Sequence, residues 1–113
     1  MKHGQGEFRW ASGGHYVGQY REDIKQGYGE MYWADGSIYR GMWDRGIQNG
    51  LGIMIFASGT RKAGIFKDNV LIELLISFES VLTLEQQSPE PFPETFKTEL
   101  KEYIGLMNMK ENN

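Results

Sequence analysis

The sequence predicts a mainly β protein in which three β-hairpins in tandem are followed by one or two amphipathic helices. Three observations predict this class. The chain contains a gap-free internal repeat of 23 residues, each repeat has a glycine-containing turn between two alternating runs, and the C-terminal part spaces its apolar residues at helical intervals. At 113 residues, the chain has the size of one small domain.

The internal repeat covers residues 4–69 and divides into segments 4–26, 27–49 and 50–69. A frame of glycines and large side chains returns in each segment without an insertion, which chance does not explain. The matching glycines are Gly4, Gly27 and Gly50; Gly6, Gly29 and Gly52; Gly13, Gly36 and Gly59; and Gly18, Gly41 and Gly64. The matching large residues are Phe8, Met31 and Met54; Trp10, Trp33 and Phe56; Tyr16 and Tyr39, where Lys62 breaks the series; and Tyr20, Trp43 and Phe66.

Each repeat has the pattern of a β-hairpin. Two short alternating runs flank the tetrapeptides ASGG, ADGS and ASGT. Asp or Ser followed by Gly suits a type I turn whose glycine adopts the left-handed conformation. Alternation along the strands places Met31, Trp33 and Trp43 on one face of the sheet. Because a glycine within a strand marks a place where another group lies against bare backbone, we expect Gly29 and Gly41 to leave room for neighbouring rings.

The opposite face of the sheet changes from polar in the first repeat to apolar in the third. In the third repeat it carries Ile53, Ile55 and Ile65. An exposed apolar cluster of this kind on a sheet is unfavourable. We therefore expect these three isoleucines to be covered, either by the C-terminal part of the chain or by a partner.

Residues 70–85 form an apolar segment that is expected to cap the sheet as a helix. On a helical wheel Leu71, Leu74, Leu75, Phe78, Val81 and Leu82 share one arc. A strand remains an alternative, because Ile72, Leu74, Ile76 and Phe78 also alternate with polar residues.

Residues 86–93, QQSPEPFP, form a proline-rich linker, and residues 94–109 are predicted to form an amphipathic helix. Four apolar residues of this helix recur at helical spacing. Because the linker separates them from the repeats, we expect them to dock on a partner and not to complete the core. These residues are Phe96, Leu100, Ile104 and Met107.

The sequence lacks the residue patterns that catalysis or cofactor binding requires. There is no cysteine, so a thiol nucleophile and a cysteine-ligated metal are excluded. The two histidines, His3 and His15, have no partners at the spacing of a triad or a metal site. The Gly-x-Gly triplets precede strands and are not followed by Lys-Ser/Thr, so they do not resemble phosphate loops. We expect no enzymatic activity, no cofactor and no metal.

Charge and composition narrow the partners and the compartment. The formal net charge is −3; residues 1–69 carry nine Lys or Arg and seven Asp or Glu, and residues 70–113 carry three and eight. This balance provides no basic stripe for nucleic acid and little attraction to an anionic membrane. The absence of cysteine and of a long apolar run favours an intracellular protein of the cytoplasm or cytoskeleton.

The stretch GYGEMYWADGSIYRGMW, residues 27–43, resembles the repeat of the MORN family: Gly-x-Gly, an aromatic residue, Asp-Gly and then Tyr-x-Gly-x-Trp. The resemblance covers residues 4–69. It implies an elongated, twisted, single-layer antiparallel sheet with one hairpin per repeat, whose aromatic face lines a shallow groove. Similarity to MORN proteins of motile cilia, such as radial-spoke head components, implies a place in the axoneme of a cilium or flagellum.

The function predicted from these features is a non-catalytic scaffold protein that binds other proteins of a large assembly. Self-stacking of the aromatic rows is the alternative to a binding groove. The predicted groove residues are Phe8, Trp10, Tyr16, Tyr20, Met31, Trp33, Tyr39, Trp43, Phe56 and Phe66.

Three further possibilities follow from the family and from the ends of the repeat array. The first alternative function is a lipid-binding membrane tether, which would need a cationic face. The second is a regulatory module that acts on an enzyme in trans. In addition, the strand at residues 4–10 is predicted to lie at a sheet edge and to contact another subunit, which can be a second copy of the chain.

Overall fold

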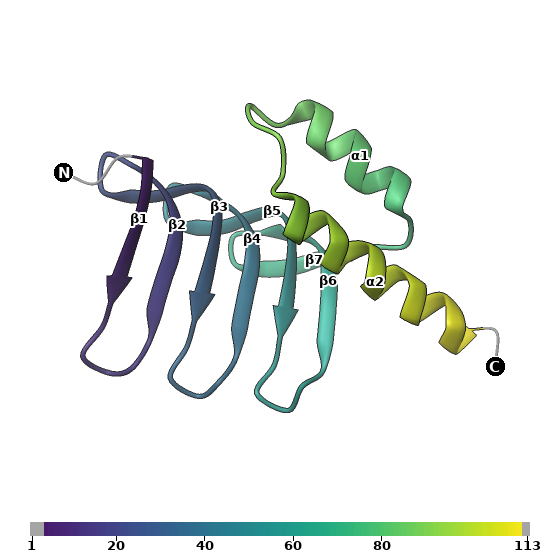
Figure 1. Cartoon of the computed structure of the whole chain (residues 1–113), viewed down its shortest axis with the longest axis horizontal. Coiled ribbons are helices and arrows are strands. Elements are labelled where there is room, and N and C mark those ends of the chain that lie inside the picture. Colours follow the sequence, from purple (N-terminus) through teal and green to yellow (C-terminus); the bar gives the residue numbers. More distant parts are fainter. Residues whose placement is uncertain (1–3, 112–113) are drawn as a thin grey trace.

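The computed structural model describes residues 4–111 as one seven-stranded antiparallel sheet followed by two helices (Figure 1). The strands are hydrogen-bonded in sequence order from β1 to β7. The predicted mainly β class with C-terminal helices is confirmed. Of the two histidines considered in the sequence analysis, His3 lies outside the described residues. The elements are β1 Gly4–Arg9, β2 His15–Arg21, β3 Ile24–Tyr32, β4 Ile38–Asp44, β5 Ile47–Ile55, β6 Arg61–Lys67, β7 Val70–Leu74, α1 Phe78–Gln87 and α2 Glu94–Glu111.

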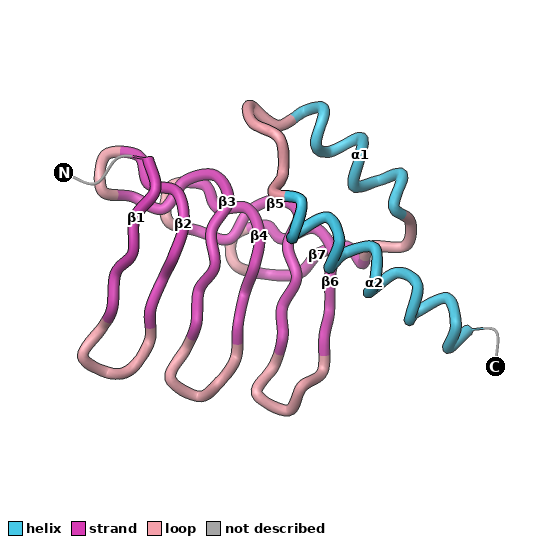
Figure 2. The backbone as a smooth tube through the Cα atoms, viewed as in Figure 1, coloured by secondary structure: helices cyan, strands magenta, loops and turns pink. Residues whose placement is uncertain are grey.

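The three turns inside the repeats lie together at one end of the sheet (Figure 2). Their glycines Gly13, Gly36 and Gly59 have φ values of 106°, 94° and 93°, as the predicted turn requires. In the second repeat the Gly36 amide donates to the Trp33 carbonyl at 3.1 Å, and the Asp35 carboxylate accepts from Ser37. The predicted hairpin turns are therefore confirmed.

The two turns that join successive hairpins, and the turn that joins β6 to β7, each have two central residues with positive φ. This geometry is that of a type I′ turn, which matches the twist of the flanking strands. The central pairs are Glu22 and Asp23, Arg45 and Gly46, and Asp68 and Asn69.

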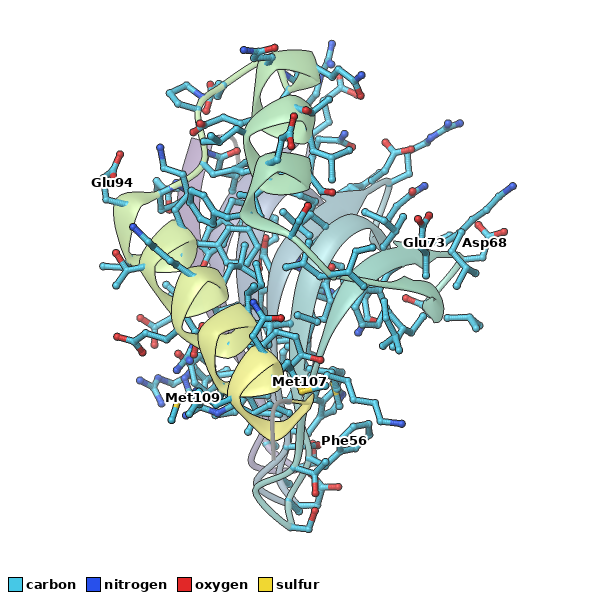
Figure 3. All side chains as sticks on the ribbon, turned by 90° about the vertical axis from the view of Figure 1, so that its right-hand side faces the viewer. Phe56, Asp68, Glu73, Glu94, Met107 and Met109 are labelled. Atoms are coloured by element: carbon cyan, nitrogen blue, oxygen red, sulfur yellow. The ribbon has the colours of Figure 1, made fainter. Side chains whose placement is uncertain are left out.

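The sheet is bent, so that its two sides differ in shape. In the side view the helices lie on one side of the sheet. The β6–β7 turn with Asp68, and β7 with Glu73, project on the other side (Figure 3). The strand register shifts between Gly18 and Tyr20, and again between Gly41 and Trp43. Because a bulge bends a strand and increases its local twist, these shifts account for the bend. We call the two sides the concave face and the helix-covered face.

Tyrosine rings lie over glycines on the concave face. A Cβ atom at Gly52 would lie 2.5 Å from the Tyr39 ring, and one at Gly29 would collide with the Tyr16 ring. The expected room for a ring is confirmed at Gly29. At Gly41 an added Cβ would lie 2.5 Å from the backbone of Gly52 on the adjacent strand and 2.9 Å from the Tyr39 hydroxyl, so backbone and a tyrosine side chain both approach this glycine.

The main core lies between the sheet and the two helices. Ile53 is fully buried in it, and Ile65 packs half-buried against it. Ile55 is half-buried. Of the two predicted alternatives, cover by the C-terminal part of the chain or cover by a partner, the structure shows the first: the chain's own C-terminal part covers this face. The buried members of the core are Leu51, Ile53, Ala63, Leu75, Val81, Phe92, Phe96, Leu100, Tyr103 and Ile104.

The predicted helix over residues 70–85 is wrong in its first part. Val70–Leu74 forms β7, which pairs with β6, and the Leu75 amide continues that pairing by donating to the Ala63 carbonyl at 2.9 Å. Within residues 70–85 the helix begins only after Ser77, as the first part of α1. The Ser77 hydroxyl accepts a hydrogen bond from the Ser80 amide as an N-cap. Pairing with β6 satisfies the backbone N–H and C=O groups of Val70–Leu74. The local sequence pattern does not reveal this pairing, because it is a contact between strands.

The predicted reach of the last helix toward a partner is also wrong for three of its four residues. Phe96, Leu100 and Ile104 are 1%, 0% and 8% exposed in the chain's own core, whereas Met107 is 38% exposed. The linker, which begins only after Gln87, does not act as an extended spacer. Phe92 is buried, and its amide donates to the Glu85 carboxylate at 2.9 Å, so the loop folds back against α1.

Candidate protein-binding groove

Five buried aromatic side chains form a ladder along the concave face. Neighbouring rings meet edge to face, with centroids 5.1 Å apart for Tyr16 and Tyr20, 5.6 Å for Tyr16 and Trp43, 5.2 Å for Tyr39 and Trp43, and 5.1 Å for Tyr39 and Phe66. Such contacts stabilise aromatic pairs beyond their burial. The ladder forms a second core on a face that no helix covers.

Two ladder tyrosines are tied to the bends of their own strands. The Tyr16 hydroxyl donates to the Gln19 carbonyl at 2.9 Å, and the Tyr39 hydroxyl donates to the Met42 carbonyl at 2.8 Å. Burial raises the pKa of both phenols well above the ordinary value near 10. These tyrosines are therefore neutral hydrogen-bond donors with a structural role.

Beside the ladder an open groove of about 840 Å³ lies inside the bend. Trp43 and Phe66 of the ladder are buried at its base, and Trp33, Met31 and Phe56 remain partly exposed. In the side view Phe56 projects from the turn end of the sheet, away from the helices (Figure 3). The full lining is Lys25, Met31, Trp33, Trp43, Gln48, Met54, Phe56, Lys62, Phe66, Asn69, Val70 and Leu71.

Lys25 lies at the groove with its ammonium among three rings. Its Nζ atom is 5.4 Å from the ring centroids of Trp10 and Tyr16 and 5.5 Å from that of Trp43. A cation over aromatic faces is attracted by the ring quadrupoles. Burial lowers the pKa of this ammonium.

The structure separates the ten predicted groove residues into two groups. Five of them line the groove: Met31, Trp33, Trp43, Phe56 and Phe66. Tyr16, Tyr20 and Tyr39 are buried in the ladder, while Phe8 and Trp10 contact each other in a T-shaped pair on the first repeat. Self-stacking describes the ladder and the groove lies beside it, and Trp43 and Phe66 belong to both.

Sequence reasoning missed one row of residues in the groove. Lys25, Gln48 and Leu71 are 23 residues apart, each on the strand that follows a two-residue turn, and all three line the groove. Their chemistry differs in each repeat, so no shared residue type marked the position. The 23-residue spacing is the signal that could have found it.

A charged network lies on the helix-covered face and fastens α2 to the sheet. The Arg40 guanidinium donates to the Glu99 carboxylate at 2.7 Å. Glu30 accepts hydroxyl hydrogen bonds from Tyr28 at 2.8 Å and Tyr32 at 2.6 Å. Every member pairs with another member, so we assign the network a structural role.

No metal-binding group is found among the residues that the structure describes: no three or more His, Asp or Glu side chains converge at the distances a metal ion needs. Within residues 4–111, neither helix is both long and apolar enough to cross a membrane.

An open single-layer sheet of tandem hairpins, with an aromatic ladder on one face, defines a repeat protein. The sequence profile of the MORN repeat matches residues 1–15, 16–38 and 39–61, more than half of the chain. The chain belongs to the MORN repeat family. The second and third profile matches begin at Tyr16 and Tyr39, so the profile frame has the same 23-residue period as the frame predicted from the sequence but a different start.

MORN repeats are non-catalytic modules that typically serve in scaffolds for interaction with proteins or membranes. No curated protein sequence has significant similarity to the chain.

Proposed function

We propose that the protein is a non-catalytic scaffold component that binds a segment of another protein in the groove of the concave face. The observation that carries this proposal is the asymmetry of the sheet. The helix-covered face is closed by the chain's own α1 and α2, whereas Trp33 and Phe56 remain partly exposed on the concave face. Partly exposed aromatic side chains beside a recessed apolar base have the composition of interface anchors.

We further propose that the assembly is ciliary or axonemal. The support for this placement is the resemblance of the repeat to those of radial-spoke MORN proteins.

The test of the groove combines cross-linking in cells that express the chain with a double variant, Trp33→Ala/Phe56→Ala. Trp43 is a poor choice for this purpose because it is buried and its indole N–H donates to the Gly29 carbonyl at 3.1 Å. Truncation of an aromatic interface anchor costs about 2 kcal/mol or more, which corresponds to about a 30-fold loss of affinity.

A matched control is Leu82→Ala/Leu106→Ala. These side chains lie on α1 and α2 and are 45% and 55% exposed, against 41% for Phe56, and neither lines the groove nor lies on β1. We expect the control to retain the cross-linked partner and Trp33→Ala/Phe56→Ala to lose it. Equal recovery of the partner by a folded Trp33→Ala/Phe56→Ala variant would refute the groove as the binding site.

A second contact is proposed at β1, which is the edge strand of the sheet at the N-terminal end. Edge strands pair readily with strands of other chains. We propose that residues 4–10 contact another subunit of the assembly. Amide hydrogen exchange at residues 7–10, compared in the isolated chain and in the assembly, tests this contact; equal exchange in the two states would exclude it.

A further inference from the structure

The groove on the concave face has an uneven charge distribution. Among its lining residues are two lysines, Lys25 and Lys62, and two side-chain amides, whereas Asp and Glu are missing from the lining. All other lining residues are apolar or aromatic. An occupant therefore meets an apolar surface with two cations and no carboxylate.

Among the residues that the structure describes, Lys25 is a cation without a paired anion. In the described part of the chain it forms no ion pair, and its ammonium is held among three aromatic rings at 5.4–5.5 Å. Partial burial removes water from this ammonium and lowers its pKa. A carboxylate placed beside it would restore the lost solvation through a charge-assisted hydrogen bond.

Lys62 is the second cation and replaces a structural tyrosine. The equivalent residues Tyr16 and Tyr39 are buried and bonded to backbone carbonyls. Lys62 is instead exposed at the groove, and among residues 4–111 it also forms no ion pair. It lies on β6, three strand spacings or about 14 Å across the sheet from β3. The strand register puts it level with Met31, which is six residues along β3 from Lys25.

The shape of the groove favours a polypeptide segment over a membrane surface. Its base, formed by Trp43 and Phe66, is 6% and 4% exposed and lies inside the bend of the sheet. Individual side chains can enter such a recess. A flat bilayer surface would rest on the rim and leave the base without contacts.

From these observations we infer that the groove takes a segment rich in both large apolar and acidic residues, whose carboxylates pair with Lys25 and Lys62. This inference rests on the proposed function, because it names the chemistry of the partner that the same groove binds.

The experiment is a selection from a library of random short peptides displayed on phage, with the full chain as bait. We expect the recovered peptides to combine Phe, Trp, Leu or Met with Asp or Glu and to contain few Lys or Arg. The peptide with the highest affinity is then titrated against variants of the full chain.

The decisive variant is Lys25→Gln/Lys62→Gln. Glutamine is the residue that the second repeat carries at the Lys25 position, as Gln48, so the sheet accommodates it. We expect affinity for the acidic peptide to fall at least about tenfold at low salt and by less at high salt, because salt screens the lost attraction. Thermal unfolding of the variant checks that it is folded.

The matched control is Lys67→Gln/Lys101→Gln, which removes the same charge outside the groove. Lys67 is exposed at the end of β6, and the Lys101 ammonium lies 5.7 Å from the Phe78 ring centroid on the helix-covered face. We expect this control to change the affinity less than about twofold. An equal loss in both double variants would contradict specific pairing, since it would show that net charge alone is responsible.

The remaining outcomes separate this inference from the proposed function. Peptides without an acidic bias whose binding needs Trp33 and Phe56 would overturn the inference and leave the proposed function standing. Peptides that bind Trp33→Ala/Phe56→Ala as tightly as the original chain would overturn both. Phosphatidylserine vesicles that bind through the two lysines, while peptides fail to bind, would overturn both in favour of a membrane surface.

Discussion

At the scale of single residues, one tyrosine in each of the first two repeats links a bend to a glycine. Tyr39 donates its hydroxyl to the Met42 carbonyl, where the strand register shifts, and its ring lies over Gly52. Tyr16 makes the equivalent contacts in the first repeat. The spacing of aromatics and glycines in the repeat is thus a requirement of packing.

This coupling predicts opposite effects for two Gly→Ala substitutions. Gly52→Ala places a methyl group 2.5 Å from the buried Tyr39 ring, so we expect a loss of about 1–3 kcal/mol from the free energy of unfolding. Gly105 lies in α2, and a Cβ added at this position would meet no atom within 4 Å. We expect Gly105→Ala to stabilise the protein by about 0.5–1 kcal/mol, through higher helix propensity.

Urea unfolding of the two variants measures both effects. A Gly52→Ala protein as stable as the original would show that Tyr39 can move away from the strand without loss. The ring would then not define the bend.

The sequence identified the face of each aromatic residue but not its depth. Alternation along the strand is a local property, so Trp33 and Trp43 were assigned correctly to one face. Depth depends on rings from neighbouring strands and on the bend: Tyr16 is buried between Tyr20 and Trp43. A pattern of single residues does not contain these distances.

At the scale of elements, α2 is part of the core. Its buried side packs against the sheet through apolar contacts. Two ion pairs flank these contacts: Arg40 of β4 pairs with Glu99 of α2 at 2.7 Å, and Lys97 of α2 pairs with Glu85 of α1 at 3.0 Å. A helix held in this way closes the apolar face of the third repeat. It does not act as a separate docking arm.

Two truncations in α2 test this role. Leu100 is fully buried, so Leu100→Ala is expected to cost about 2–5 kcal/mol in the free energy of unfolding. Met107 is 38% exposed, and Met107→Ala is expected to change that free energy by about 0.5 kcal/mol or less. Chemical denaturation measures both; near-equal, small effects would indicate that α2 detaches from the sheet in solution.

The errors at the C-terminal end of the sequence analysis have a common physical cause. Residues 71–82 fit a helical pattern and residues 72–78 within them also fit an alternating pattern, and only pairing with β6 decides for a strand at Val70–Leu74. The proline-rich loop has the composition of a spacer. The hydrogen bond that folds it back joins the Phe92 amide to the side chain of Glu85, seven residues earlier, and composition does not predict such a contact. Both outcomes depend on contacts between elements.

At the scale of the whole molecule, the sheet carries two cores on its two faces. Helices close one core, and an aromatic ladder forms the other. The buried tyrosines must remain protonated. Burial raises the pKa of Tyr16 and Tyr39 in the ladder, and burial together with the Glu30 carboxylate raises the pKa of Tyr28, which packs against the helix-covered core.

This burial predicts a loss of stability at high pH. In the unfolded chain these phenols ionise near pH 10, whereas in the folded chain they keep their protons. The folded state therefore binds more protons above that pH, so stability is unchanged below about pH 10 and falls as the pH rises further. Tyr39 alone contributes a slope of up to about 1.4 kcal/mol per pH unit.

Urea unfolding at several values from roughly pH 8 to roughly pH 11 measures this slope, with tyrosinate absorbance as a second signal. We expect Tyr39→Phe to reduce the slope. A folded protein whose stability does not change up to roughly pH 11 would contradict the buried ladder.

The methionine methyl groups report on both faces of the molecule at once. Met31 and Met54 line the groove, Met42 packs against the helix-covered core, and Met107 and Met109 lie exposed on α2. Methyl NMR of the full chain, titrated with the partner segment, therefore tests the central claim that the concave face binds and the helix-covered face does not. The account predicts shifts of the Met31 and Met54 signals with Met42, Met107 and Met109 unchanged; shifts of Met107 and Met109, with Met31 and Met54 unchanged, would contradict it.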